Sequence, residues 1–375
     1  MGNRESGILS NGASPSSFMS LRPFWSSAKD IRDLKDRNDG LIKIPIPYSH
    51  SRPMPLTDFP LEKLRTYRGI TARPADFDAY WTSALAELDA LDPQLQLAPA
   101  DHQFPGAECF LAHWNGVGNA RLHAKYLRPA GVSAPHSLII IFHGYSGFSG
   151  DWVDKLAWVA MGFSVLAVDV RGQSGLSDGG GSTRGKIFAG LVTRGLAEGS
   201  HALYFRHVFQ DAALAARIAM QLPHVDPARI VVKGDSQGGG LAIACAALEP
   251  RIAAAASLYP FLSDYRRVWE MDLAENAYED IRKWFREYDP LHEREDWFFE
   301  QLGYIDVQHL APRVRGRVIM GVGLADKVCP PSTQFAIFNR LECEKKMLVY
   351  PDFGHENIRT WADDAAEFLV TAIYH

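Results

Sequence analysis

The pattern of apolar and polar positions predicts a helix and a hairpin at the start of the patterned part of the chain. Phe77, Trp81 and Leu88 belong to a series of apolar residues at helical spacing, which predicts an amphipathic helix. Two apolar runs at 108–114 and 120–127 then flank the turn-rich sequence NGVGN, and this arrangement is typical of a β-hairpin.

Beyond the hairpin, short apolar runs alternate with helix-like segments. Strands that are apolar on both faces and alternate with helices indicate an α/β fold, with a mainly parallel central sheet and helices on both of its faces. Binding and catalytic residues gather at the carboxyl ends of the strands in such sheets. The runs lie at 137–142, 163–169, 230–233, 254–258, 318–322 and 347–350, and the helix-like segments at 152–161, 208–222 and 241–248.

Three regions differ in composition. Residues 1–53 are rich in Ser, Asn, Gly and charge without periodicity, so we expect a poorly ordered N-terminal arm. This arm is either a real addition or the product of an upstream start misread as coding. Residues 54–375 are expected to form one folded domain, in which the charged and aromatic stretch at 264–313 interrupts the strand–helix alternation as an inserted helical region.

Composition narrows the functional class. The 375 residues are 47% hydrophobic and 22% charged, with a net charge of −5, which is ordinary for a globular protein and does not favour a nucleic-acid partner. No apolar run approaches the roughly 18 residues of a membrane span, so no membrane association is expected. The four cysteines are scattered and form no CxxC pair, which favours a cytoplasmic protein over a disulfide-stabilised secreted one.

The segment RIVVKGDSQGGGLAIACAAL at 229–248 contains the most informative motif. A β-branched strand leads into Gly-Asp-Ser-Gln-Gly, and a helix of small residues follows. This is the G-x-S-x-G nucleophile elbow in the strand–turn–helix context that it requires. The motif predicts Ser236 as a nucleophile and the backbone N–H of Gln237 as a donor to a developing oxyanion.

A serine nucleophile needs a base and an acid that orients the base. The expected chain order is Ser, then Asp or Glu, then His. His355 lies in a short loop after the last predicted strand and before a final amphipathic helix, and we predict it as the base. Asp326 follows the preceding strand and is the predicted acid. Asp352, three residues before the histidine, and Asp235, beside the serine, are the alternatives.

The second oxyanion donor is expected in the loop after an early central strand. There the sequence SLIIIFHGYSG occupies the place of the HGGG-type loop of such enzymes. We assign the backbone N–H of Tyr145 to this role. The neighbouring His143 is interpreted as structural.

These motifs together resemble one family. VRGQSG (170–175), GDSQGG (234–239) and GHE (354–356) match the RGQ, GxSQG and HE signatures of the family 7 carbohydrate esterases, which are acetyl xylan esterases and cephalosporin C deacetylases of the α/β-hydrolase superfamily. The resemblance extends from about residue 55 to the C-terminus. It implies removal of acetyl groups from small acetylated sugars, such as xylo-oligosaccharides, and from related acetate esters such as cephalosporin C.

The resemblance also implies roles for individual residues and a state of assembly. It makes Ser236, Asp326 and His355 the triad, with no metal and no cofactor. It makes Arg171 and Gln173 a pair that braces a loop. It places the substrate pocket at Tyr145, Tyr259, Pro260 and Phe261, where the last three could equally be a plain strand end. A homo-oligomer, often a hexamer in this family, is expected. The arm at 1–53 and the amino-acid sequence of the 264–313 insertion depart from the family pattern.

Two other functions remain open on the sequence. One is a related hydrolase that acts on another ester, a lactone or a peptide, although the RGQ and HE motifs argue against it. The other is a binding module without activity on the same scaffold, but all three predicted triad members are retained.

Overall fold

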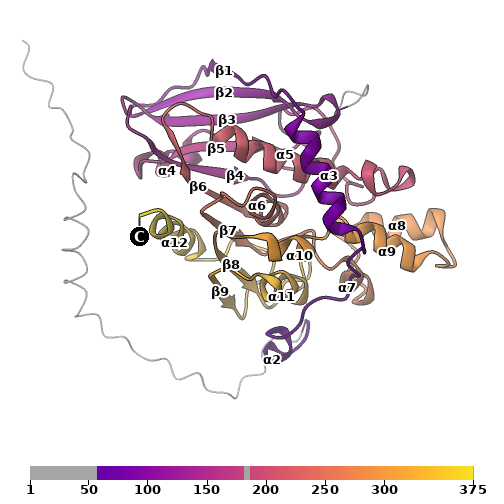
Figure 1. Ribbon diagram of the computed structural model, residues 1–375. Helices are drawn as coiled ribbons and strands as arrows, with labels where there is room; N and C mark the ends of the chain where they lie inside the picture. Colours follow the sequence, from indigo (N-terminus) through magenta and orange to yellow (C-terminus); the bar gives the residue numbers. More distant parts are fainter. Residues whose placement is uncertain (1–56, 181–185, 375) are drawn as a thin grey trace, which may run out of the picture. The chain divides into compact units, whose positions relative to one another are not determined.

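The computed structural model describes residues 57–180 and 186–374, so the predicted arm at 1–53 lies outside the described residues. Within these described residues, nine strands form one sheet in the order β1-β2-β3-β5-β4-β6-β7-β8-β9 (Figure 1). Neighbouring strands from β1 to β5 are antiparallel, and those from β5 to β9 are parallel. The strands are β1 (Gln96–Pro99), β2 (Ala107–Asn115), β3 (Arg121–Pro129), β4 (His136–Phe142), β5 (Ser164–Asp169), β6 (Val225–Asp235), β7 (Ala254–Leu258), β8 (Arg317–Gly323) and β9 (Lys345–Tyr350).

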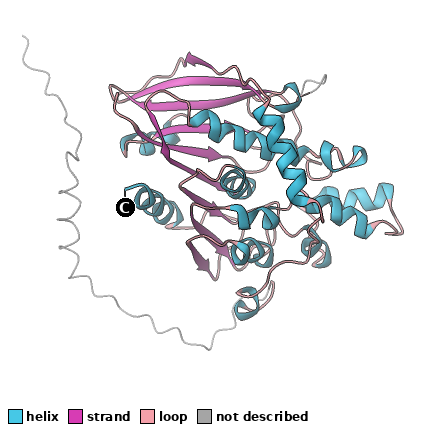
Figure 2. Cartoon of the chain, in the orientation of Figure 1, coloured by secondary structure: helices cyan, strands magenta, loops and turns pink. Residues whose placement is uncertain are grey.

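Helices surround this sheet (Figure 2). The segment between β7 and β8 contains helices and no strand, and it coincides with the stretch interpreted above as an insertion. The helices are α2 (Leu61–Leu64), α3 (Phe77–Asp89), α4 (Leu156–Ala160), α5 (Tyr204–Ala219), α6 (Gln237–Leu248), α7 (Tyr265–Glu270), α8 (Glu279–Tyr288), α9 (Glu295–Gly303), α10 (Val307–Leu310), α11 (Pro331–Arg340) and α12 (Trp361–Tyr374).

The central strands are buried on both faces. On β4, Leu138 and Ile140 join the core that contains α5 and α6, whereas Ile139 joins a separate core with α4 and α12. Successive side chains of a strand point to opposite faces, so a strand covered on both sides must be apolar at consecutive positions. This explains the continuous apolar runs of the sequence and confirms the predicted α/β fold with its mainly parallel sheet.

The order of the strands reverses at the centre of the sheet. The chain passes from β4 outward to β5 and then returns to the other side of β4 to form β6. Ligands of open α/β sheets bind at such a reversal, outside the carboxyl ends of the strands. The loop that begins at residue 143 follows β4, and Ser236 follows β6. The fold therefore brings these two segments together.

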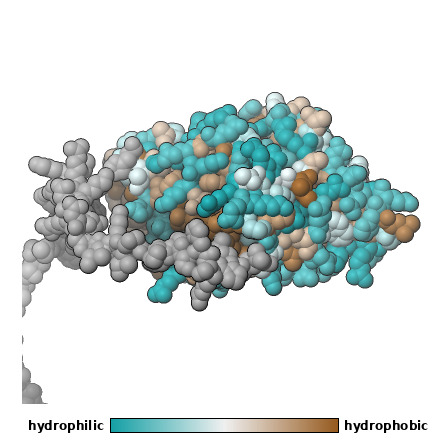
Figure 3. Space-filling model, turned by 90° about the horizontal axis from the view of Figure 1, so that it is seen from below, coloured by the Kyte–Doolittle hydropathy of each residue, from teal (hydrophilic) through white to brown (hydrophobic). Residues whose placement is uncertain are grey.

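None of the helices in residues 57–180 and 186–374 combines the length and apolar character needed to cross a bilayer. Hydrophilic and hydrophobic residues are interspersed on the face drawn in Figure 3.

Candidate active site

Ser236 lies on a sharp turn between β6 and α6. Its backbone has φ 57° and ψ −119°, a conformation that non-glycine residues rarely adopt and that is typically found at functional sites. The Ser236 N–H donates to the Leu258 carbonyl at 2.9 Å, and the Ser236 carbonyl accepts from the Phe261 N–H at 3.0 Å. These bonds from the neighbouring strand and the segment after it hold the strained turn in place.

The glycines of the motif are required by close contacts. A Cβ added to Gly234 would lie 2.3 Å from the carbonyl carbon of Gly238, and one added to Gly238 would lie 2.2 Å from the carbonyl oxygen of Phe142. Real Cβ atoms do not approach backbone so closely, and the contacting atoms cannot move away without disrupting the sheet. Only glycine allows α6 to begin this close to β4 and β6.

A continuous chain of hydrogen bonds joins the serine, the histidine and an aspartate. The Ser236 Oγ lies 3.0 Å from the Nε2 of His355, and the Nδ1 of His355 lies 2.9 Å from an oxygen of Asp326. An ionised carboxylate only accepts hydrogen bonds, so it favours the tautomer in which Nδ1 carries the proton and Nε2 is free to accept the proton of the serine. The geometry is that of a nucleophile, a general base and an orienting acid.

Asp326 is fixed by its own loop. Its side chain is fully buried, and its Oδ1 accepts from the backbone N–H groups of Val328 and Cys329, each at 2.8 Å. The other oxygen is thereby directed at the imidazole. The structure thus places Asp326, and neither sequence alternative, against His355: the two ring nitrogens of His355 contact Asp326 and Ser236, which leaves none for Asp235, and Asp352 is exposed.

The two expected oxyanion donors follow adjacent strands. Phe142 at the end of β4 pairs with Gly234 of β6, so Tyr145 and Gln237 leave the sheet side by side. Gln237 begins α6, where the first N–H groups have no partner within the helix. Within the described residues, no hydrogen-bond acceptor is assigned to the N–H of Tyr145 or to that of Gln237. Both donors are available to a developing oxyanion.

His143 serves the loop rather than the reaction. Its Nε2 accepts from the Val170 N–H at 3.0 Å, and its Nδ1 is 2.7 Å from the Gly144 carbonyl. Burial lowers the pKa of His143, in keeping with a neutral ring that donates from one nitrogen and accepts at the other. The side chain holds the loop after β4 against the end of β5.

Arg171 and Gln173 connect this loop region to the elbow. The buried Arg171 forms two hydrogen bonds with the Asp211 carboxylate, at 2.5 and 2.6 Å. The amide of Gln173 exchanges two hydrogen bonds with the side chain of Gln237, at 2.8 and 3.1 Å. The Tyr204 hydroxyl donates to the Arg171 carbonyl at 2.6 Å. None of these contacts involves the hydroxyl of the serine, and Gln173 holds the side chain of Gln237, which directly follows Ser236. The contacts therefore position the elbow and its oxyanion donor.

The expected pocket residues fall into two groups. The ring of Tyr259 packs against the imidazole of His355, with centroids 4.3 Å apart. Phe261 packs edge-on against Tyr145 at 5.6 Å and has no exposed surface. Pro260 is also buried. Phe261 and Pro260 therefore lie behind the residues that face the reaction, and they support a pocket wall without forming its exposed surface.

Asp169 was not singled out from the sequence, yet it organises the loops around the oxyanion donors. Its carboxylate accepts from the N–H groups of Ser149 and Leu176, at 2.6 and 2.8 Å, and lies 2.7 Å from the Nδ1 of His123. Burial alone would raise its pKa, but these bonds lower the pKa to about 2. The sequence signal that could have identified Asp169 is its position as an acidic residue at the carboxyl end of an apolar strand.

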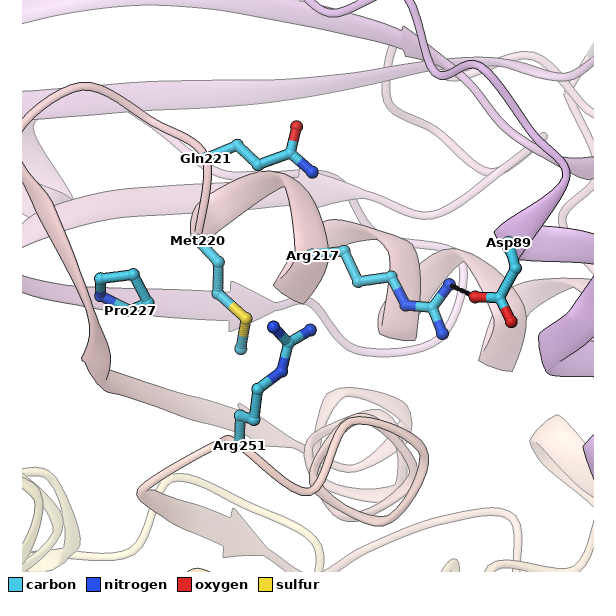
Figure 4. Close-up of a pocket in the computed structure, with 6 residues that line it drawn as sticks. All are labelled: Asp89, Arg217, Met220, Gln221, Pro227 and Arg251. Atoms are coloured by element: carbon cyan, nitrogen blue, oxygen red, sulfur yellow. Dashed lines mark hydrogen bonds and ion pairs between the residues drawn. The ribbon is translucent and has the colours of Figure 1, made fainter.

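A separate surface pocket lies near the amino end of the central strand β6 (Figure 4). Pro227, near the amino end of β6, contributes to it, whereas Ser236 follows the carboxyl end, about 30 Å away at roughly 3.3 Å per strand residue. Its arginines are already paired: Arg217 with Asp89 at 2.8 Å, and Arg251 with Glu249 at 2.7 Å. This pocket takes no part in the chemistry at the elbow.

No three His, Cys, Asp or Glu side chains in the described part of the chain come together as a metal site.

A mainly parallel sheet that carries a serine elbow after a central strand, with an aspartate and a histidine after later strands, defines an α/β-hydrolase.

Comparisons with known proteins identify the family. Residues 54–372 match the family model described as acetyl xylan esterase (AXE1). Acetyl xylan esterase 1 from Thermoanaerobacterium sp. JW/SL YS485 is 50% identical, with a TM-score of 0.82 over 85% of this chain and 100% of that one. The acetyl xylan esterase from Paenibacillus sp. R4 is 32% identical, with a TM-score of 0.76 over 84% of this chain and 99% of that one.

A third similar protein is longer. Acetyl esterase Axe7A of Xylanibacter ruminicola is 26% identical over 306 residues, which cover 79% of this chain and 66% of that protein. The chain therefore spans just under two thirds of that relative. It belongs to the acetyl xylan esterase family, and it is a carboxylic ester hydrolase that acts on acetyl esters.

Proposed function

We propose that the protein removes acetyl groups from acetylated xylo-oligosaccharides through an acetyl-serine intermediate on Ser236. The serine oxygen attacks the acetyl carbonyl while His355 takes its proton. The carbonyl oxygen becomes an oxyanion that accepts from the N–H groups of Tyr145 and Gln237. The tetrahedral intermediate collapses, the sugar oxygen leaves with the proton from His355, and the acetyl group stays on Ser236. A water molecule, deprotonated by His355, then releases acetate and restores the serine.

The observation that carries this proposal is the unbroken chain from the Ser236 hydroxyl to the buried Asp326 carboxylate, with bonds of 3.0 and 2.9 Å. An alkyl hydroxyl becomes a nucleophile only when a positioned base accepts its proton. Asp326 has no exposed surface, so water does not compete for its carboxylate, which stabilises the imidazolium that forms during attack.

The choice of an acetylated sugar rests on the named relatives. The two solved structures named above are acetyl xylan esterases, and one of them shares 50% sequence identity with this chain. Packed aromatic rings behind Tyr145 support the preference for a small acyl group, because Phe261 touches Tyr145 and Tyr278 in turn touches Phe261, with centroids 4.4 Å apart. A cephalosporin-type acetate carries the same acyl group on a different alcohol and is a second proposed substrate.

Product analysis tests this function. Purified protein is incubated with acetylated xylo-oligosaccharides, with a cephalosporin-type acetate and with an amide substrate, and released acetate is measured beside the Ser236→Ala variant. We expect acetate from both esters with the native chain, none with the variant, and no amide cleavage. Failure to deacetylate the sugar with retained hydrolysis of another ester, a lactone or a peptide would assign the site to a different substrate.

A further inference from the structure

The helical segment between β7 and β8 places a buried carboxylate close to the oxyanion loop. Asp280 lies in the first turn of α8, and only 6% of its surface is exposed. Its Oδ2 accepts from the backbone N–H of Thr193 at 2.8 Å and from the hydroxyl of Thr193 at 3.2 Å. Burying a carboxylate is costly unless it forms such bonds. This acid therefore anchors the 191–193 segment to the helix.

The anchored segment in turn contacts Tyr145. The backbone N–H of Leu191, two residues before Thr193, donates to the Tyr145 hydroxyl at 3.2 Å. After burial, the Asp280 carboxylate is the next contribution that raises the pKa of Tyr145, so the acid and the phenol are electrostatic neighbours. A chain of short contacts thus runs from α8 through Thr193 and Leu191 to the side chain of Tyr145, whose backbone N–H is the proposed oxyanion donor.

An aromatic contact runs in parallel from the same helical segment. Tyr278, two residues before Asp280, is fully buried and packs on Phe261, which packs edge-on against the ring of Tyr145. The ring of Tyr145 is thus held by the ring of Phe261 and, at its hydroxyl, by the N–H of Leu191. Neither Asp280 nor Thr193 is hydrogen-bonded to Ser236, His355 or Asp326 in the described residues. The hydrogen-bonded route from Asp280 toward the reaction runs through Thr193 and Leu191 to Tyr145.

We propose that Asp280 is a positioning residue for acyl transfer, which holds Thr193 and Leu191 so that the Tyr145 backbone N–H is aimed at the oxyanion. This inference rests on the proposed function, because it needs Tyr145 as an oxyanion donor. Loss of a whole oxyanion donor reduces kcat by about 10²- to 10³-fold. Misplacement of one donor, with the other intact, is expected to reduce kcat by about 10- to 100-fold, since misplacement by as little as 1 Å can cost about 10²-fold.

Four variants test the inference with an acetate ester as substrate. Asp280→Ala, which leaves Thr193 without an acceptor, is expected to reduce kcat by about 10- to 100-fold with KM changed less than about threefold, the pattern of an interaction made only in the transition state. Asp280→Asn retains an acceptor oxygen and should recover most of the activity. Tyr145→Phe removes the phenolic hydroxyl that accepts a hydrogen bond from the Leu191 N–H and keeps the ring. The control is Glu279→Gln, the adjacent residue of α8, whose pairing with Lys283 is exposed.

The decisive readout is a double-mutant cycle. If Asp280 acts through the phenol, Asp280→Ala reduces kcat in the native background but adds no further loss in Tyr145→Phe. Equal losses in both backgrounds, an unchanged kcat in Asp280→Ala, or the same loss in Glu279→Gln would overturn the inference. If Asp280→Ala does not fold, Thr193→Val takes its place in the cycle, because it removes only the hydroxyl half of the contact and should give a smaller loss that again disappears in Tyr145→Phe.

Two control measurements separate this inference from the proposed function. Activity that survives Ser236→Ala would contradict the acetyl-serine mechanism itself. Loss of activity in Ser236→Ala, together with a native kcat in Asp280→Ala, would leave that mechanism intact and reject only the role of Asp280.

Discussion

The loops at the carboxyl ends of the strands and the helical segment between β7 and β8 serve the same site in different ways. At the strand ends the orienting acid is fixed by its own loop: Asp326 accepts from Val328 and Cys329, two and three residues away. The helical segment acts over long separations, as when Asp280 binds Thr193, 87 residues earlier. The difference shows that local backbone geometry supplies the chemistry, while distant packing sets the shape in which it operates.

The largest expected effect lies at the strand ends. Ser236→Ala should lower kcat by about 10⁵- to 10⁶-fold, as loss of the nucleophile does in serine hydrolases, with little change in the melting temperature because a small polar group is lost. Steady-state kinetics beside a thermal melt measures both. Residual activity above about one per cent would show that the chemistry does not depend on this turn.

The next largest effect is expected at Asp326, the acid that orients His355. Asp326→Asn should lower kcat by about 10⁴-fold, because an amide can favour the wrong imidazole tautomer. Asp352→Asn, which changes an exposed carboxyl three residues from His355, is the matched control and should stay within about twofold of the native kcat. Reversal of the two results would move the acid to Asp352 and remove Asp326 from the triad.

Acyl-chain length tests the contribution of the helical segment. Nitrophenyl acetate should be hydrolysed faster than the butyrate by roughly 10- to 200-fold or more in kcat/KM, since a longer chain must push into packed rings at a cost of about 1–3 kcal/mol. Octanoate should be almost inert. Tyr278→Leu, which thins the aromatic stack, should reduce the acetate preference, whereas Trp297→Leu, at an exposed position of the same segment, should not.

A rise in kcat/KM from acetate to octanoate would indicate a lipase-like pocket and would contradict the preference for acetyl groups. An unchanged ratio in Tyr278→Leu would mean that the segment between β7 and β8 does not shape the acyl side.

The smallest expected effect concerns stability. Asp306 is fully buried at the start of α10 and accepts from the Asp264 N–H at 2.8 Å. Burial and the Asp264 carboxylate raise the pKa of Asp306 to about 7. The folded pKa lies above the ordinary value of about 4, so the stability from this group is complete below about pH 4 and is lost as the pH rises through 7.

Comparison with Asp306→Asn isolates this contribution. Between pH 4 and 7, the unfolding free energy of the native chain should fall relative to that of the variant by at most about 1.4 kcal/mol per pH unit. The variant is needed because half-buried His207 and buried His309, with pKa values lowered to about 4 and about 3 chiefly by burial, act in the opposite direction. Denaturant unfolding at several pH values measures the difference. Parallel curves would show that Asp306 stays charged in the folded protein.

The two regions also differ in how far their roles could be predicted from the sequence. The sheet and the hairpin follow from the periodicity of apolar residues, and the elbow follows from a motif whose glycines are required by close backbone contacts. The structure brings Ser236, Asp326 and His355 together as expected. The contact of Asp280 with Thr193 depends on how a helix packs on a loop 87 residues earlier, which no local pattern encodes. For the same reason Phe261, expected in the pocket, lies buried behind Tyr145.

The most direct test of the central claim, that Ser236 is a nucleophile activated by His355 and Asp326, is labelling with a fluorophosphonate followed by mass spectrometry of the proteolytic peptides. We expect one label per chain on the peptide that contains Ser236, complete loss of acetate hydrolysis in step with labelling, and much slower labelling in Asp326→Asn. Labelling at another residue, or full hydrolysis after complete labelling of Ser236, would contradict the account.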